Sequence, residues 1–313
     1  MKVLLPDTID LDPQLPAGTV TAVYDVRAPI PAGHTDAEVL VVWGNTAANL
    51  ADAARRLTAL RWVQTLAAGP DAVLAAGFAG DVQVTAGLGL HDRTVTEHTL
   101  GLVLAAARRL NLLIRAQIGH RWAGELGGLQ PVRPTGSFRT LNGANVLIWG
   151  FGGIAGRLSP LLTALGANVT GVARTAGTRH GFPVVTENGL PDLLPTTDLL
   201  INILPATPET TGIVGTAVLD RLPAHAWLVN VGRGSTVDET ALLTAIRSGR
   251  LAGAALDVFA TEPLPASSPL WDEPGVIITP HAAGGRPEGA SGLLTANLSG
   301  YVTGAPLRNT VAR

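Results

Sequence analysis

The stretch NVLIWGFGGIAG (Asn145–Gly156) decides the fold that we expect for this chain. An apolar run ends at closely spaced glycines, and a segment of helical character follows from Ile154 to Leu165. This order is typical of a buried parallel strand that turns sharply into a helix whose N-terminus binds a phosphate. A second β-prone run, Asn168–Ala173, comes one helix length later. The pattern therefore predicts a β-α-β dinucleotide-binding unit.

Three positions of this stretch have different tasks in a dinucleotide site. Gly150 permits the tight turn, and Gly152 removes the side chain that would keep a pyrophosphate from the backbone N–H groups. The third position of the G-x-G-x-x-G/A pattern is Ala155, which is small enough for close helix–strand packing. The chain contains 37 glycines, so this spacing also arises by chance. The flanking strands and helix are what favour a dinucleotide site over a merely structural turn.

Length and composition limit the classes of protein to which the chain can belong. The 313 residues are enough for two domains with separate cores, and 46% apolar with 15% charged residues describes a compact folded chain. A formal net charge of -2 gives no reason to expect a nucleic acid or an anionic membrane as partner. The absence of cysteine excludes disulfides, thiolate metal sites and thiol nucleophiles. We expect no metal site.

Neither a leader peptide nor a membrane span is expected. Met1–Asp12 has no basic segment followed by an apolar core. The apolar stretch around Leu100–Ile114 is interrupted by Arg108 and Arg109, which argues against a membrane-spanning helix. We therefore expect a cytoplasmic protein.

Short β-prone runs alternate with helical stretches before residue 92. The runs are Lys2–Leu5, Val20–Tyr24, Val39–Trp43, Arg61–Leu66 and Val82–Thr85, with helical character at Ala47–Leu60 and Asp71–Ala76. Such alternation predicts a small, doubly wound α/β domain. A single helix is then expected over Asp92–Gln117, followed by a surface segment over Gly119–Leu141.

The same alternation continues after the glycine motif. Further β-prone runs are Val184–Val185, Leu199–Leu204, Ala226–Val231, Gly253–Asp257 and Val276–Thr279. A helix is expected over Glu239–Ser248, with Asp238 as its N-cap and Gly249 as its stop. About six or seven parallel strands are expected for a Rossmann sheet. The helical tail Ala290–Tyr301 is expected to return to the first domain.

The end of the second strand bears on which dinucleotide is bound. In an NAD site this strand usually ends in an acidic residue that accepts hydrogen bonds from the adenosine ribose. Here the position is Ala173, and Arg174 follows it. Without the carboxylate a 2′-phosphate is no longer repelled, and Arg174, Arg179 and the Thr175 hydroxyl can donate to it. We favour NADP; the alternative is that Arg174 is an ordinary solvated arginine and the protein accepts NAD weakly.

Three ionisable residues follow separate strands, where an open parallel sheet places its ligands. They are Arg233, Glu262 and His281. Each alone is more often a solvated or structural residue. Together they match what carbonyl reduction needs: a cation that polarises the carbonyl and holds the carboxylate, an acid that delivers the proton, and a carboxylate that orients that acid and stabilises its protonated form.

These features resemble the D-isomer-specific 2-hydroxyacid dehydrogenase family. The similarity runs in order from about Arg61 to Arg308, and the ordered Arg…Glu…His set is far more specific than the glycine loop. The segments that carry it are Gly150–Ala155, Asn202–Thr207, Val229–Gly234, Ala255–Phe259, Glu262–Leu264 and Thr279–His281.

The resemblance implies a homodimeric, NAD(P)-dependent oxidoreductase of α/β fold that acts on a small 2-keto or 2-hydroxy acid. A Rossmann dinucleotide-binding domain, residues 93–287, would be inserted into a discontinuous, flavodoxin-like substrate-binding domain, residues 1–92 and 288–313. The active site would lie in the cleft between these domains.

The resemblance also implies roles for individual residues. Arg233 would bind the carbonyl and carboxylate of the substrate, His281 would be the general acid in reduction and the base in oxidation, and Glu262 would hydrogen-bond its far ring nitrogen. Backbone amides at Ala68 and Gly69 would take the substrate carboxylate. The cofactor would be lined by Gly150, Gly152, Gly153, Ile154, Ala173, Arg174, Thr175, Leu204, Pro205, Thr210, Val231, Gly232, Asp257 and Gly284, with Asp257 on the nicotinamide side.

Two departures from the family pattern bear on specificity. The missing acid at Ala173 puts NAD preference in doubt, and Arg286 stands where many relatives have small hydroxyl residues. As a hypothesis, Arg286 and Trp43 shape the substrate end of the cleft and favour a small anionic acid, glyoxylate or hydroxypyruvate; alternatively, Arg286 faces solvent. A relative acting on formate, phosphite, phosphoglycerate or an aromatic 2-keto acid, and a non-catalytic dinucleotide sensor, remain alternatives. The complete Arg233, Glu262 and His281 set argues for catalysis.

Overall fold

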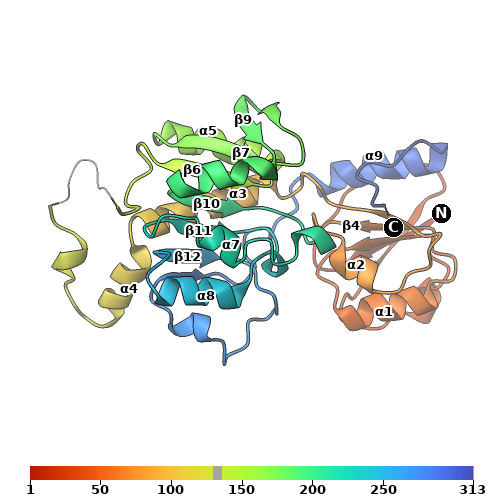
Figure 1. The fold of residues 1–313 in the computed structure, drawn as a ribbon. Coiled ribbons are helices and arrows are strands. Elements are labelled where there is room, and N and C mark those ends of the chain that lie inside the picture. Colours follow the sequence, from red (N-terminus) through yellow and green to blue (C-terminus); the bar gives the residue numbers. More distant parts are fainter. Residues whose placement is uncertain (130–135, 313) are drawn as a thin grey trace. The chain divides into compact units, whose positions relative to one another are not determined.

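A computed structural model describes residues 1–129 and 136–312 of the chain. They form two compact units, one of Met1–His91 with Gly285–Arg313 and one of Asp92–Gly284. Each unit is a mainly parallel sheet covered by helices (Figure 1), so the predicted α/β class is confirmed. Over these described ranges, no helix is both long enough and apolar enough to cross a membrane.

The unit that contains both termini is built on a five-stranded parallel sheet of order β2-β1-β3-β4-β5. Its strands are β1 Lys2–Pro6, β2 Val20–Tyr24, β3 Val39–Val42, β4 Trp62–Thr65 and β5 Gln83–Thr85. This strand order is that of flavodoxin-like folds. Helices α1 (Ala47–Arg56) and α2 (Asp71–Ala75) cover one face of the sheet. On the other face, α9 (Ala290–Thr303) buries Leu294 and Leu298.

The second unit holds an eight-stranded sheet of order β13-β12-β11-β10-β6-β7-β9-β8. Pairs from β13 to β9 are parallel, and the edge strand β8 pairs antiparallel with β9. The strand order reverses beside β6, which is where doubly wound sheets bind their ligands. The strands are β6 Asn145–Trp149, β7 Asn168–Val172, β8 Gly177–Arg179, β9 Phe182–Val185, β10 Leu199–Asn202, β11 Trp227–Asn230, β12 Gly253–Leu256 and β13 Val276–Ile278.

Two helical layers enclose this sheet (Figure 1). One face packs against α3 (Asp92–Ala107) and α5 (Gly153–Ala164). The other packs against α6 (Leu190–Leu193), α7 (Thr216–Leu219) and α8 (Glu239–Arg247). The predicted cap of α8 is confirmed, because the Asp238 side chain accepts hydrogen bonds from the backbone of Thr240 and Ala241. Gly249, with φ 71°, follows the end of that helix.

The expectation of one helix over Asp92–Gln117 is wrong. The chain breaks between α3 and α4 (Leu110–Ile118), where Arg109 is left-handed with φ 53°. The Arg109 guanidinium donates to the carbonyl of Leu126 at 2.6 Å, so a tertiary contact accompanies the break. Apolar spacing runs on through this point and therefore did not reveal it. Part of the expected surface segment, residues 130–135, lies outside the described residues.

Candidate active site

The glycine turn after β6 leaves the start of α5 accessible. Gly150 has φ 99°, and a methyl group there would lie 2.8 Å from the carbonyl carbon of Ile203. Gly152 is the N-cap of α5, and no heavy atom lies within 4 Å of where its side chain would be. Ala155 is fully buried against the sheet. Free space at Gly152 beside a helix N-terminus fits a pyrophosphate, because the first helical N–H groups have no intrahelical partners.

The end of β7 presents basic groups rather than a carboxylate. Arg174 is exposed and makes no hydrogen bond or ion pair with a described residue. Arg179, from β8, donates to the Thr175 hydroxyl at 2.5 Å and to the carbonyl of Phe151 at 3.5 Å. Strand β8, which the sequence patterns did not reveal, thus bonds to the glycine turn. This edge suits the 2′-phosphate of NADP, because guanidinium groups form strong charge-assisted hydrogen bonds with phosphate.

A buried polar network holds the turn that carries Arg233. The Asn230 amide donates to the carbonyl of Arg233 at 3.2 Å, and the Thr236 hydroxyl donates to the same carbonyl at 2.6 Å. Asn202 donates to both Asn230 and Thr236, at 3.0 and 2.6 Å. The Arg233 side chain is half-buried and donates to the carbonyl of Gly232 at 2.8 Å. Its backbone is therefore fixed, and a planar guanidinium fork is the kind of group that binds a planar anion.

Close backbone packing joins this turn to its neighbours. A methyl group on Gly232 would lie 2.5 Å from the carbonyl oxygen of Leu204, and one on Gly234 only 1.8 Å from the carbonyl carbon of Phe259. Glycine is thus required at both positions for steric reasons. The turns after β10, β11 and β12 are consequently in direct contact along one edge of the sheet.

Glu262 and His281 form a hydrogen-bonded pair beyond the ends of β12 and β13. The His281 Nδ1 lies 2.7 Å from Glu262 Oε2, and the other carboxylate oxygen accepts from the backbone N–H of Phe259 at 2.9 Å. Both side chains are partly exposed. A ring nitrogen bonded to a carboxylate carries its proton there, which leaves Nε2 as the nitrogen that can exchange a proton with a ligand. The pairing expected of these two residues is present.

Asp257 is fully buried at the end of β12. Its carboxylate accepts from the Thr279 hydroxyl at 2.6 Å and from the backbone N–H groups of Ala282 and Ala283 at 2.8 and 3.1 Å. Its backbone carbonyl accepts from the N–H of His281 at 2.7 Å. Asp257 therefore binds and holds the loop that carries His281.

The other expected cofactor residues lie at the same sheet edge. The hydroxyl of Thr210 donates to the carbonyl of Pro205 at 2.7 Å, in a loop that a Thr207–Thr210 capping box stabilises. Ile154 lies in the first turn of α5, and Val231 directly follows β11. Gly153 lies against the carboxylate of Asp92, at the start of α3. Gly284 is half-buried, three residues after His281.

Ala68, Gly69 and Trp43 belong to the unit that contains the termini. The backbone N–H groups of Ala68 and Gly69 make no hydrogen bond with a described residue. Trp43 stacks on His91 with ring centroids 5.3 Å apart, and His91 Nε2 lies 2.8 Å from the carbonyl of Leu66, at the end of β4. The amides of Ala68 and Gly69 thus lie in the turn that begins at Leu66, and Leu66 is hydrogen-bonded to the His91 ring on which Trp43 stacks.

Several residues that organise the site escaped the sequence reasoning. Asn202 and Asn230 end buried strands, and a polar residue at that position was the available signal. In the sequence, Thr279 stands out only as the first residue of the segment Thr279–His281. His98 lies on α3, far from the site in sequence, and only the fold brings it to Asp257.

Comparison with known proteins identifies relatives over most of the chain. The family model described as D-isomer specific 2-hydroxyacid dehydrogenase, NAD binding domain, matches residues 100–283. Glyoxylate/hydroxypyruvate reductase A of Escherichia fergusonii is 47% identical over 118 residues, which span 37% of this chain and 38% of that protein. The matched part is thus well under half of that relative.

Two solved structures are similar to this chain over nearly its whole length. The D-isomer specific 2-hydroxyacid dehydrogenase from Xanthobacter autotrophicus in complex with NADPH and MES is 30% identical, with a TM-score of 0.78 over 99% of this chain and 97% of that one. The NADPH-dependent glyoxylate/hydroxypyruvate reductase from Sinorhizobium meliloti in complex with NADP and sulfate is 25% identical, with a TM-score of 0.80 over 99% and 97%. The resemblance inferred from the motifs is confirmed.

Proposed function

Because the chain belongs to the D-isomer specific 2-hydroxyacid dehydrogenase family, we propose that it is an NADPH-dependent reductase of glyoxylate or hydroxypyruvate. The observation that carries the proposal is the His281–Glu262 pair, 2.7 Å apart, on the sheet edge that also bears the glycine turn and Arg233. The names of the relatives support the substrate class. Oxidation of NADPH in the presence of glyoxylate, hydroxypyruvate and phenylpyruvate tests it.

Each residue of the proposed site has one task. Bound NADPH would supply a hydride to the carbonyl carbon of the keto acid. His281 Nε2 donates the proton that the carbonyl oxygen takes up, so the product is the neutral alcohol of a hydroxy acid. Glu262 orients the imidazole and stabilises its protonated form before transfer. Arg233 binds the carboxylate and polarises the carbonyl with its planar fork.

NADP is the proposed cofactor, held by the glycine turn and by Arg174, Thr175 and Arg179. Replacing Arg174 with alanine should lower kcat/KM for NADPH about 10- to 100-fold, the worth of one or two charge-assisted hydrogen bonds. The value for NADH should change little, because NADH has no 2′-phosphate. Arg221→Ala is the control, since Arg221 is also exposed and unpaired among the described residues. An equal loss with both cofactors would contradict the assignment.

Glu262→Gln isolates the role of the carboxylate. The amide oxygen can still accept from the N–H of Phe259, but the amide nitrogen would face the proton on His281 Nδ1. We expect kcat to fall about 10- to 100-fold, less than loss of the acid itself. Glu187→Gln, at an exposed position, is the control; a kcat for Glu262→Gln equal to that of the wild type would exclude this role for Glu262.

We propose that the unit containing the termini binds the substrate. The N–H groups of Ala68 and Gly69 bond to no described residue, which supports binding of a carboxylate there. A ring as large as Trp43 beside that turn supports a preference for small keto acids. Arg286 belongs to the same unit and is proposed to act with Trp43. Other keto acids remain the alternative substrates. A dinucleotide sensor would bind NADPH tightly without reducing any keto acid.

A homodimer is the proposed assembly. Leu110, Ile114 and Ile118 lie four residues apart on one face of α4, at the periphery of its unit (Figure 1), and are 42%, 52% and 74% exposed. Trp122 lies in the loop after the end of α4 and is 97% exposed. Several large exposed apolar side chains on one helix face are typical of an interaction surface.

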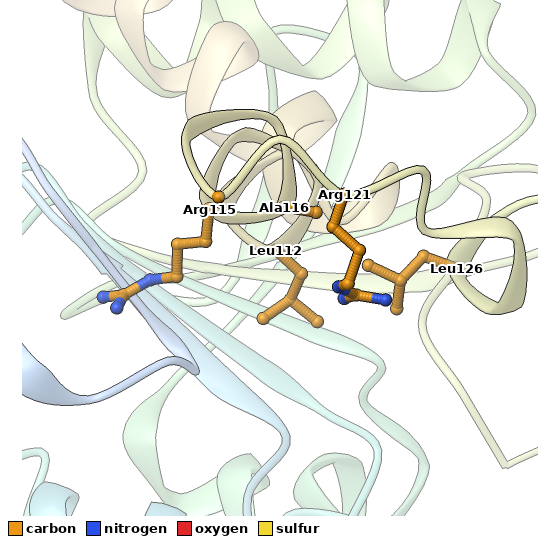
Figure 2. A pocket seen from close by; sticks show the side chains of 6 residues that line it. Leu112, Arg115, Ala116, Arg121 and Leu126 are labelled. Atoms are coloured by element: carbon orange, nitrogen blue, oxygen red, sulfur yellow. The ribbon is translucent and has the colours of Figure 1, made fainter.

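A hollow of about 460 Å³ lies beside the same helix. Figure 2 shows Leu112 and Ala116 between the side chains of Arg115 and Arg121, with Leu126 beside Arg121. An apolar floor with arginines at the rim is the composition of many protein interfaces. The hollow therefore supports contact with a second copy of the chain at this surface.

Ile118→Asp should weaken the dimer. A charge in an apolar interface is costly, and we expect the dissociation constant in sedimentation equilibrium to rise about 30-fold or more, as for a hot-spot residue. Leu161→Asp, at a 42% exposed position on α5, is the control. If both variants sediment as wild type does, α4 is not the interface.

A further inference from the structure

His98 reaches the buried Asp257 carboxylate from helix α3. Its Nε2 lies 3.0 Å from the Thr279 hydroxyl oxygen and 3.2 Å from Asp257 Oδ1. The single hydroxyl proton of Thr279 is directed at Asp257 Oδ1, 2.6 Å away. Thr279 can therefore only accept from His98, so Nε2 must carry a proton. The tautomer of His98 is thus determined by its partners.

This cluster of His98, Thr279 and Asp257 surrounds the base of the loop that bears His281. The loop backbone at Ala282 and Ala283 donates to the Asp257 carboxylate, and the N–H of His281 donates to the Asp257 carbonyl. A buried carboxylate is stable only while such donors hold it. The loop and the carboxylate consequently stabilise one another, and His98 contributes the donor that comes from outside the loop.

The backbone of His281 depends on these contacts. Its φ of 51° lies in the left-handed region, which a residue with a side chain adopts only when its surroundings impose it. The imidazole itself is 47% exposed, and its one side-chain hydrogen bond with a described residue is to Glu262. The direction of the ring is therefore set by this bond to Glu262 together with the loop beneath it.

We propose that His98 is a positioning residue, which acts through Thr279 and Asp257 to hold the His281 imidazole in its reactive orientation. The inference rests on the proposed function, in which His281 Nε2 exchanges a proton with the substrate. Small displacements of a reacting group are expensive, and about 1 Å can cost about 10²-fold in rate. Turnover therefore depends on His98, although His98 lies on a separate helix.

Two pairs of variants test the proposal. Thr279→Val removes the hydroxyl at nearly constant shape, while Thr279→Ser keeps it. His98→Leu removes the donor, while His98→Gln keeps an N–H of similar reach. We expect His98→Leu and Thr279→Val to lower kcat about 10- to 100-fold with KM and the Kd for NADPH within about 3-fold of wild type. Thr279→Ser and His98→Gln should recover most of that loss.

His225→Leu is the matched control for a purely structural effect. His225 pairs with Asp198 at 2.7 Å in the same unit, and its side chain has the same 23% exposure as His98. This pair precedes β10 and β11 and so lies at the opposite edge of the sheet. Its loss should lower the melting temperature without lowering kcat. If His98→Leu and Thr279→Val lower kcat no more than His225→Leu does, the proposal is overturned.

A second measurement does not need turnover. A proton shared between His281 Nδ1 and Glu262 should give a downfield resonance in the proton NMR spectrum, identified by its absence in His281→Ala. We expect it to shift or broaden in His98→Leu and Thr279→Val, and to return in the two conservative variants. An unchanged resonance in all four would overturn the proposal. Failure of the wild type to reduce any keto acid would instead contradict the proposed function.

Discussion

Replacing His281 with alanine is expected to lower kcat for keto-acid reduction by about 10²- to 10⁴-fold, the usual contribution of a positioned general acid. The imidazole is held by Glu262 at Nδ1, so Nε2 is the nitrogen that delivers the proton to the carbonyl oxygen. Methyl replacement leaves no group there that can do so. The Kd for NADPH should stay within about 3-fold of wild type, because the expected pyrophosphate and ribose contacts come from other strands. Stopped-flow single turnovers separate the hydride step from binding.

The control for this variant is His34→Ala. His34 is half-buried in the other unit, and the only hydrogen bond of its side chain with a described residue is to the carbonyl of its neighbour Gly33. It should leave both kcat and binding unchanged. Added imidazole should partly restore the activity of His281→Ala, since a free base can occupy the space that the side chain leaves. Near-normal kcat in His281→Ala without any addition would show that the proton comes from another group.

The fold could be predicted in outline because its signals are local. Buried parallel strands are short apolar runs, and the runs at Leu199–Leu204 and Ala226–Val231 differ from β10 and β11 only at their ends. The residues that follow such strands are also predictable, since strand ends share one edge of a sheet. That is why Arg233, Glu262 and His281 were singled out and why the Glu262–His281 bond is present.

What escaped prediction depends on contacts between distant segments. The break at Arg109 accompanies a bond to Leu126, and no periodicity signals it. The β8 strand exists only by pairing with β9, and its three residues are too few for a pattern. His98 looks like any half-buried polar residue of a helix until the fold brings Asp257 beside it.

Arg233→Lys is expected to lower kcat/KM for the keto acid by about 10²- to 10³-fold, the range found when a preorganised donor to a developing oxyanion is removed. The positive charge remains, but an ammonium group is a point donor and cannot bind carbonyl and carboxylate together as a planar fork does. The turn itself should persist, because Asn230 and Thr236 bind the backbone carbonyl of residue 233 rather than its side chain. Steady-state kinetics with glyoxylate and fluorescence titration with NADPH measure the two effects separately.

Three variants distinguish the effect of the positive charge of Arg233 from the effect of its planar shape. Arg233→Ala with added guanidinium should regain part of its activity, whereas Arg233→Lys should gain nothing from the same addition, because the lysine already fills the space. Arg221→Lys makes the same exchange at an exposed position and should leave kcat/KM unchanged. If Arg233→Lys stays within about 3-fold of wild type, charge alone suffices and the bidentate role of Arg233 is wrong. A loss in kcat/KM measures weaker binding of the transition state. If only KM changes, Arg233 binds the substrate but does not activate its carbonyl group.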